Sequence, residues 1–251
     1  MMEYITSRQN SLMQRIVKLQ TSRKLRTQEQ VFVGDGTKLL EEAVKWAPEL
    51  LEAVVVQEGV RCPELPARVR AVQVPRQLME QISRMDAPEG ALFLCRMPEP
   101  AVPRLVPGSL ILDGIQDPGN VGTILRTADA MDVPVFLTDG CADPWNPKTV
   151  RATMGAIFRT PPCRISHELL VEQCRSAGIP LLAAALSVQA CDLRQADLKC
   201  AAVIVGSEGS GVSSYLLEAS DGQIIIPMHP RCESLNAAVA AAILLWELSA
   251  L

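Results

Sequence analysis

The sequence contains few of the side chains from which metal sites are built. Its 251 residues include only two histidines, and its eight cysteines never stand in a Cys-x-x-Cys spacing. Zinc sites draw on closely spaced cysteine and histidine ligands. We therefore expect no metal site, and we expect most of the cysteines, which lie in apolar contexts, to be reduced residues of the core.

Long apolar runs and nucleotide-binding motifs are also missing. No stretch reaches the roughly 20 apolar residues that span a membrane, and the first residues lack the apolar run of a signal peptide. We therefore expect a cytoplasmic protein with no membrane partner. Residues 34–38, GDGTK, lack the spacing of a phosphate-binding P-loop, and the glycines of residues 206–211 do not form the GxGxxG fingerprint of dinucleotide-binding enzymes.

Charge is present but unevenly distributed. The net charge of −4 argues against a protein that coats nucleic acid by bulk charge. Residues 1–30, however, carry six basic side chains against two acidic ones, a local net charge of +4. The six are Arg8, Arg15, Lys18, Arg23, Lys24 and Arg26. A basic face on an acidic protein can contact phosphates selectively, but an ordinary solvated helix face has the same pattern.

The first part of the chain alternates between helix and strand patterns. Apolar residues at helical spacing predict a helix over residues 7–30. Further patterns predict strands at 31–36, 51–57, 69–74 and 90–95 and helices at 37–46 and 77–85. Four prolines then follow within ten residues, at 98, 100, 103 and 107, and such a stretch forms a semi-rigid spacer. We divide the chain into a small α/β domain, 1–97, a proline-rich linker, 98–107, and a second domain, 108–251.

The second domain alternates between helices and almost wholly apolar strands. The strand patterns cover 110–112, 133–139, 181–186, 201–206 and 223–228, and helices are predicted at 121–131, 149–157, 168–177 and over the last apolar stretch. This order indicates an α/β fold with a mostly parallel sheet and helices on both faces. The last helix is apolar on every side, which predicts a buried helix. Sheets of this kind bind ligands in loops beyond the carboxyl ends of their strands.

Two of these loops combine glycine with charged or amide side chains. In the first, Asn120 and Gly122 stand at a helix start, where free backbone N–H groups favour an anion or a carbonyl. Arg126 follows, and its guanidinium suits a phosphate or a carboxylate, with an internal salt bridge as the alternative. In the second loop, three glycines permit close approach to a ligand. Glu208 is the only ionisable group there, and its carboxylate could hold Arg126 or bind a ligand.

The third loop carries Ser234 and Asn236, which stand where the last helix begins. Both are common N-cap residues, so an ordinary cap is the simplest interpretation. Ile226 and Met228 are expected to form an apolar wall beside them. Taken together, the three loops contain no evident histidine base and no Ser-His-Asp set. Such a site suits the positioning of two partners for a displacement better than hydrolysis.

The three loops resemble those of the SpoU (TrmH-like) family of S-adenosylmethionine-dependent RNA ribose 2′-O-methyltransferases. The matching segments are GNVGTILRTADA at 119–130, IVGSEGSGVS at 204–213 and IIIPMHPRCESLNAAVAAAILLWE at 224–247. Residues 5–43 look like the N-terminal substrate-binding domain of that family. The resemblance implies a deep trefoil knot in the C-terminal sheet and a homodimer formed through the C-terminal domain.

The resemblance also implies roles for individual residues. It assigns contacts with S-adenosylmethionine to Gly206, Ile226, Met228 and Leu235, and it assigns the catalytic set to Asn120, Arg126, Glu208, Ser234 and Asn236. The basic face then becomes a candidate RNA contact through Arg8, Arg23, Lys24 and Arg26. The expected partner is structured RNA, with ribosomal RNA favoured over transfer RNA.

The implied reaction is attack of a ribose 2′-hydroxyl on a sulfonium methyl group. Because a guanidinium is a poor base, we hypothesise that Arg126 binds the target phosphate and orients the hydroxyl. Glu208 and Asn120 would hold Arg126 and the ribose. Two other functions fit parts of the sequence: an RNA-binding or ribosome-assembly factor without catalysis, and a nucleotide-dependent oxidoreductase. The intact catalytic set argues against the first, and the missing dinucleotide fingerprint argues against the second.

Overall fold

The computed structural model describes residues 2–187 and 189–249. The chain forms two compact units, and each is built from two separate stretches of sequence. The first unit consists of Met1–Glu99 with Asp143–Pro161, and the second consists of Pro100–Ala142 with Pro162–Leu251. Residues 143–161 therefore pack with the first unit, although they follow the proline-rich stretch in the sequence.

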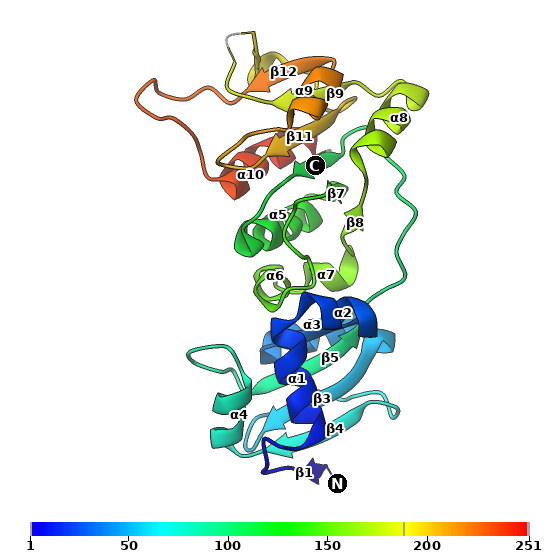
Figure 1. The fold of residues 1–251 in the computed structure, drawn as a ribbon, viewed down its shortest axis with the longest axis vertical. Helices are drawn as coiled ribbons and strands as arrows, with labels where there is room; N and C mark the ends of the chain where they lie inside the picture. Colours follow the sequence, from blue (N-terminus) through cyan, green and yellow to red (C-terminus); the bar gives the residue numbers. More distant parts are fainter. Residues whose placement is uncertain (1, 188, 250–251) are drawn as a thin grey trace. The chain divides into compact units, whose positions relative to one another are not determined.

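The first unit is a mixed sheet covered on both faces (Figure 1). Its strands are β1 (Glu3–Tyr4), β2 (Val31–Asp35), β3 (Leu51–Gln57), β4 (Arg70–Val74) and β5 (Ala91–Arg96), in the order β1-β4-β3-β5-β2 among the described residues. Strands β1, β3 and β4 run parallel to one another, and β5 is antiparallel to β2 and β3. The helices are α1 (Ser11–Thr21), α2 (Arg23–Glu29), α3 (Thr37–Trp46), α4 (Arg76–Ile82), α6 (Pro147–Ala152) and α7 (Ala156–Arg159), with a 3-10 turn at Pro48–Leu50.

The helix predicted over residues 7–30 is two helices in the structure. Ser22 lies between them in an extended conformation, with φ −109° and ψ 103°. Its backbone N–H donates to Lys18 and ends α1, while its side chain accepts from the Leu25 N–H and begins α2. A serine side chain commonly competes in this way with continued helix, and periodicity alone does not register the break.

The second unit contains a sheet in which, over the described residues, seven strands are all parallel. The strands are β6 (Leu110–Asp113), β7 (Val135–Leu137), β8 (Cys163–Arg164), β9 (Leu181–Ala184), β10 (Cys191–Asp192), β11 (Ala202–Gly206) and β12 (Gly222–Ile225), in the order β10-β12-β9-β11-β6-β7-β8. The helices are α5 (Pro118–Ala130), α8 (His167–Ala177), α9 (Ser214–Ala219) and α10 (Ala237–Leu248), with a 3-10 turn at Leu193–Gln195. The predicted α/β fold with a parallel sheet is confirmed.

Both faces of this sheet are buried, as the apolar strands indicated. On one face, Leu110, Leu112 and Val203 pack against α5 and α10. On the other face, Ile111 and Ile204 pack against α8 and α9. Because the strands are parallel, the carboxyl ends of β6, β11 and β12 lie at a common edge, from which the three polar loops leave.

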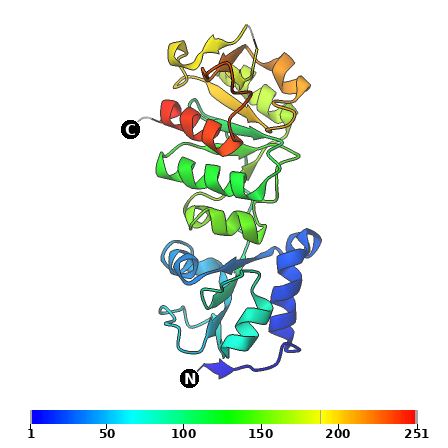
Figure 2. The ribbon, with the colours of Figure 1, turned by 90° about the vertical axis from the view of Figure 1, so that its left-hand side faces the viewer.

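The expectation that α10 is buried on every side is wrong for one of its faces. Ala241, Leu244 and Leu245 are buried against the sheet and α5, but Val239 and Trp246 are 49% and 68% exposed. Figures 1 and 2 show α10 lying along α5. The exposed Val239 and Trp246 therefore belong to a part of α10 that the sheet and α5 leave largely uncovered. Among the described residues, none of the helices has the length and apolar character needed to cross a membrane.

Candidate active site

The glycine-rich loop after β11 is a small hairpin closed by its own backbone. Ser207 and Gly211 exchange two backbone hydrogen bonds of 3.1 and 2.9 Å, and the Ser207 and Ser210 hydroxyls lie 2.8 Å apart. A Cβ atom on Gly206 would come within 2.0 Å of the Gly211 carbonyl carbon. Glycine is therefore required at position 206 for the hairpin to close against β11.

Glu208, at the tip of this hairpin, joins all three predicted loops. Its Oε1 accepts hydrogen bonds from Asn120 Nδ2 at 2.7 Å, from Asn236 Nδ2 at 2.9 Å and from the Ala237 backbone N–H at 3.1 Å. Asn236 Nδ2 also donates to Asn120 Oδ1 at 3.2 Å. Three residues separated by up to 116 positions thus form one connected polar cluster at the edge of the parallel sheet.

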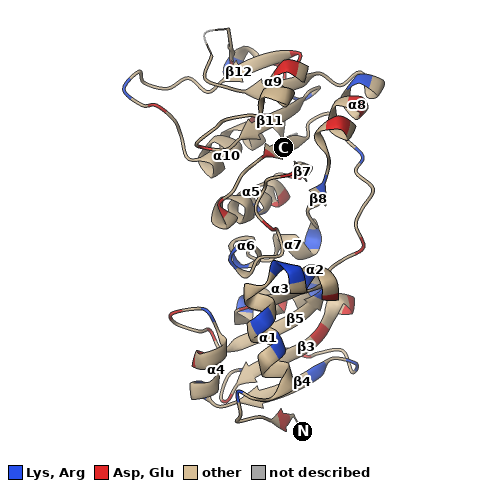
Figure 3. Cartoon of the chain, viewed as in Figure 1, with Lys and Arg blue, Asp and Glu red and all other residues tan. Residues whose placement is uncertain are grey.

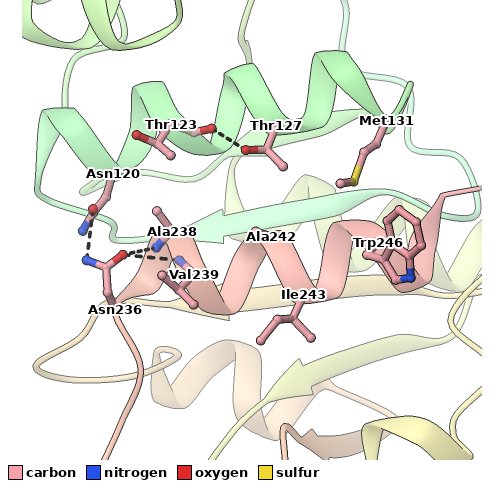
Figure 4. Close-up of a pocket in the computed structure, with 10 residues that line it drawn as sticks. All are labelled: Asn120, Thr123, Thr127, Met131, Asn236, Ala238, Val239, Ala242, Ile243 and Trp246. Atoms are coloured by element: carbon pink, nitrogen blue, oxygen red, sulfur yellow. Dashed lines mark hydrogen bonds between the residues drawn. The ribbon is translucent and has the colours of Figure 1, made fainter.

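The two ends of this cluster are set by helix starts. Asn236 is the N-cap of α10, and its Oδ1 accepts from the Ala238 and Val239 N–H groups (Figure 4). The expected cap is therefore present, and the same side chain also reaches Glu208. Asn120 lies in the first turn of α5, where Asp117 is the N-cap and accepts from the Asn120 N–H.

Arg126 does not join this cluster. Its side chain is exposed, and within the described part of the chain it makes no hydrogen bond or ion pair. Among the described residues, Arg126 therefore has neither the internal salt bridge considered for it nor the expected contact with Glu208. Glu208 instead bonds the two asparagines, which leaves the Arg126 guanidinium free to bind another molecule.

Beside the hairpin lies a pocket of about 400 Å³. It brings together Gly206, Ile226, Met228 and Leu235, all four residues expected to contact a cofactor, and it also includes Ser234 and Glu208. Ser234 thus lines the pocket and leaves the capping of α10 to Asn236. The lining also includes Ala184, the last residue of β9, with Ala185 and Leu186, which follow it, and none of the three was predicted from the sequence as a site residue. The signal for them was available, because β9 ends at the same edge of the sheet.

A second hollow, of about 590 Å³, runs between α5 and α10. Asn120 and Asn236 lie at one end of it and Met131 and Trp246 at the other, as Figure 4 shows. Thr123, Thr127, Val239, Ala242 and Ile243 line the middle. We call this hollow the α5–α10 groove. Of these residues, only Asn120 and Asn236 were predicted from the sequence to have a function.

The basic residues among positions 1–30 separate into two groups, and Figure 3 shows the Lys and Arg positions of α1 and α2 in blue. Arg8, Lys18, Arg23 and Lys24 are exposed and make no ion pair with other described residues. Arg15 is half-buried and forms ion pairs with Glu29 and Glu52. Arg26, in contrast, is 2% exposed and forms an ion pair of 2.6 Å with Asp143. The prediction that Arg26 contacts RNA is therefore wrong, because its guanidinium is enclosed and already paired.

Comparison with known proteins supplies the class to which this fold and site belong. The model of the SpoU rRNA Methylase family matches residues 108–246, and the model of the MRM3-like substrate binding domain matches residues 10–92. The chain belongs to the SpoU rRNA methylase family, so the resemblance seen in the three loops is confirmed.

Particular relatives match most of the chain. The 23S rRNA (guanosine(2553)-2′-O)-methyltransferase RlmP of Bacillus subtilis is 35% identical, over 98% of this chain and 99% of its own length. The 23S rRNA (uridine(2479)-2′-O)-methyltransferase of Streptomyces viridochromogenes is 30% identical, over 82% of this chain and 71% of its own length. Among solved structures, an AdoMet-bound rRNA methyltransferase from Sinorhizobium meliloti superposes with a TM-score of 0.85 and 28% identity, over 98% of this chain and 97% of that one.

Proposed function

We propose that this protein transfers a methyl group from S-adenosylmethionine to a ribose 2′-hydroxyl of ribosomal RNA. The observation that carries the proposal is the Glu208 cluster, which ties Asn120 and Asn236 together beside the 400 Å³ pocket. Relatives that match the chain over most of its length are named as 23S rRNA 2′-O-methyltransferases, which favours ribosomal RNA as the substrate.

The pocket fits the proposed cofactor in size and in chemistry. Ligand pockets typically enclose about 300–1,000 Å³, with apolar walls and a few polar groups that fix orientation. Ile226, Met228 and Leu235 supply apolar surface for an adenine ring. The hairpin supplies serine hydroxyls and glycine backbone that a ligand can approach closely. Once bound, S-adenosylmethionine supplies a sulfonium methyl group that an oxygen nucleophile can attack.

The residues around the pocket have separate tasks in this proposal. Glu208 fixes Asn120 and Asn236, whose amides are then placed to bind the ribose. The exposed Arg126 binds the phosphate of the target nucleotide with its planar donors and orients the 2′-hydroxyl. Because a guanidinium remains protonated, the hydroxyl proton passes to that phosphate or to water. Catalysis then rests mainly on positioning.

The substrate is held by the first unit as well. Arg8, Arg23 and Lys24 present unpaired positive charge, which suits the phosphates of structured RNA. The match of this region to a substrate binding domain supports the same assignment. The expected cytoplasmic location stays a prediction.

We further propose that the protein is a homodimer formed through its second unit. The α5–α10 groove and the exposed Val239 and Trp246 make an apolar surface of the kind that protein interfaces cover. Asn120 and Asn236 close one end of this groove. A second copy seated there would therefore border the active site.

The proposal is tested by incubating the protein with methyl-labelled S-adenosylmethionine and, separately, with unmodified 23S-type ribosomal RNA, 16S-type ribosomal RNA and transfer RNA. We expect label in one ribosomal RNA, at one nucleotide that resists alkaline cleavage. Arg126→Ala should lower turnover about a hundredfold or more, a loss comparable to that of one transition-state donor. Arg126→Lys should also lose most activity, because lysine keeps the charge but not the planar donors.

Two outcomes would redirect the assignment. Near-normal turnover by Arg126→Lys would rule out recognition of a phosphate by the guanidinium fork. Cofactor binding without transfer to any RNA, including partly assembled ribosomal particles, would favour the assembly-factor alternative.

A further inference from the structure

Asp113 is a buried carboxylate that binds groups from three other segments of the second unit. It lies at the carboxyl end of β6 and is 3% exposed. Its Oδ1 accepts from the Thr138 hydroxyl at 2.8 Å and lies 2.9 Å from His167 Nε2, while its Oδ2 accepts from the Ser213 backbone N–H at 2.7 Å. Burial raises the pKa of Asp113, but these hydrogen bonds outweigh it and hold the pKa below its ordinary value.

The bond to Ser213 fixes the far end of the glycine-rich hairpin. One end of the hairpin is held in the sheet, because Gly206 is the last residue of β11 and pairs with Asp113 in the ladder. The other end emerges at Ser213, the residue before α9. Since the hairpin is closed by its own backbone bonds, fixing both ends at its base also fixes Glu208 at its tip.

We infer that Asp113 is a positioning residue for methyl transfer, which acts by holding the Ser213 end of the hairpin and thereby placing Glu208 and the cofactor pocket. The inference rests on the proposed function. Asp113 and His167 could instead act as an acid-base pair, but neither residue lines the 400 Å³ pocket. His167 Nε2 is engaged by Asp113, and its ring stacks on Tyr215 with centroids 5.8 Å apart. The Asp113–His167 pair therefore lies outside the pocket and supports the hairpin through the bond to Ser213.

Ser213 offers a matched pair of variants. Its φ of −58° suits proline, which lacks both the N–H that Asp113 accepts and the serine hydroxyl. Ser213→Ala keeps the backbone N–H that Asp113 accepts and removes only the hydroxyl, which does not cap α9, so it serves as the control. We expect Ser213→Pro to weaken binding of S-adenosylmethionine about tenfold relative to Ser213→Ala, measured by calorimetry. In the protein without cofactor, the amides of Ser207 and Gly211 should exchange hydrogen faster in Ser213→Pro.

Asp113 itself supplies a rescue test. Asp113→Ala should lose cofactor affinity at least as strongly as Ser213→Pro. In Asp113→Asn, the amide oxygen can accept from Ser213, while the amide nitrogen can donate to the Thr138 hydroxyl and the His167 ring nitrogen. Asparagine should therefore restore affinity and turnover to within about threefold of the unaltered protein, which a role in proton transfer would not permit.

Clear results would overturn the inference. One is equal hydrogen exchange of the hairpin amides and equal cofactor affinity in Ser213→Pro and Ser213→Ala. The other is a loss of cofactor affinity and turnover in Asp113→Asn as large as the loss in Asp113→Ala. If Asp113→Ala does not fold, the Ser213 pair decides alone. If the unaltered protein binds no S-adenosylmethionine, the proposed function fails, and hydrogen exchange still decides whether Asp113 holds the hairpin.

Discussion

Arg26 links two stretches of the first unit that are far apart in the sequence. Its guanidinium donates to Asp143 Oδ2 at 3.1 and 2.6 Å and to the Leu19 carbonyl at 2.7 Å. Removing one partner of a buried ion pair leaves the other charge uncompensated, which costs about 3–5 kcal/mol. We expect Arg26→Ala to lower the free energy of unfolding of the first unit by that amount, measured by urea denaturation.

An exposed ion pair of the same unit provides the control. Arg70 and Glu3 form a salt bridge of 2.9 Å, with both side chains about half exposed. Such pairs contribute only about 0–1 kcal/mol, so Arg70→Ala should change stability little. Equal destabilisation by the two variants would show that the Arg26 pair is no more than a surface contact.

The residues of the active site were predictable to different degrees. Asn120, Glu208 and Asn236 follow strands of one parallel sheet, and the carboxyl ends of such strands meet at one edge, so their convergence followed from the order of elements. The burial of Arg26 did not follow, because it depends on Asp143, which lies 117 positions away. Likewise, the sequence predicted that Arg126 lies on a helix, but it could not show that Glu208 accepts hydrogen bonds from Asn120 and Asn236 and not from Arg126.

At the scale of elements, Arg8, which precedes α1, and Arg23 and Lys24, in the first turn of α2, form the basic surface that we assign to RNA. Neutralising phosphates releases condensed counterions, so the slope of log affinity against log salt shrinks by about 0.7–0.9 for each phosphate that the protein no longer neutralises. Replacing Arg8, Arg23 and Lys24 together by glutamine should therefore weaken RNA binding and flatten its salt dependence by about two to three units. Filter binding over a range of salt concentrations measures both, and cofactor affinity should stay unchanged.

A control for this surface removes the same charge elsewhere. Arg70, Arg76 and Arg194 each form an ion pair with a nearby acidic side chain, so glutamine at all three changes the net charge equally without removing unpaired cations. This control should bind RNA nearly as well as the unaltered protein. If both triple variants lose the same affinity for RNA, net charge explains the effect, and the surface of Arg8, Arg23 and Lys24 has no special role.

The helices and strands of the structure differ from the predicted ones in two situations: where a capping side chain ends a helix, and where a strand is very short. Ser22 divides one predicted helix into two because its hydroxyl caps α2. The strands β8 and β10 have two residues each, too few for an apolar pattern to be recognised. The strands β3, β6 and β11 were predictable, because a strand buried on both faces is a nearly continuous apolar run.

At the scale of the whole molecule, the path of the chain lay beyond the reach of sequence patterns. Residues 143–161 leave the parallel sheet after β7 and pack with the first unit, where Trp145 lies against Phe32 with ring centroids 4.8 Å apart. Hydrophobic periodicity reports that a residue is buried but not which core buries it. The trefoil knot implied by the family resemblance stays a prediction for the same reason, since threading leaves no periodic signal.

The apolar face of α10 belongs to the homodimer that we propose. An apolar pattern predicted that Val239 and Trp246 are buried, and both are exposed in the single chain. Replacing both by glutamate should place charges in the proposed interface, which is costly when they are unpaired. We expect light scattering to give twice the chain mass for the unaltered protein and the single chain mass for the double variant.

The control is Trp46→Glu, which alters a tryptophan 48% exposed on the first unit and should leave the mass unchanged. The double variant should also lose methyl transfer, because the α5–α10 groove ends at Asn120 and Asn236 and a second copy in the groove would border the Glu208 cluster. A double variant that remains dimeric would place the interface elsewhere. A monomeric variant with full activity would instead separate dimer formation from catalysis and show that one protomer holds the complete site.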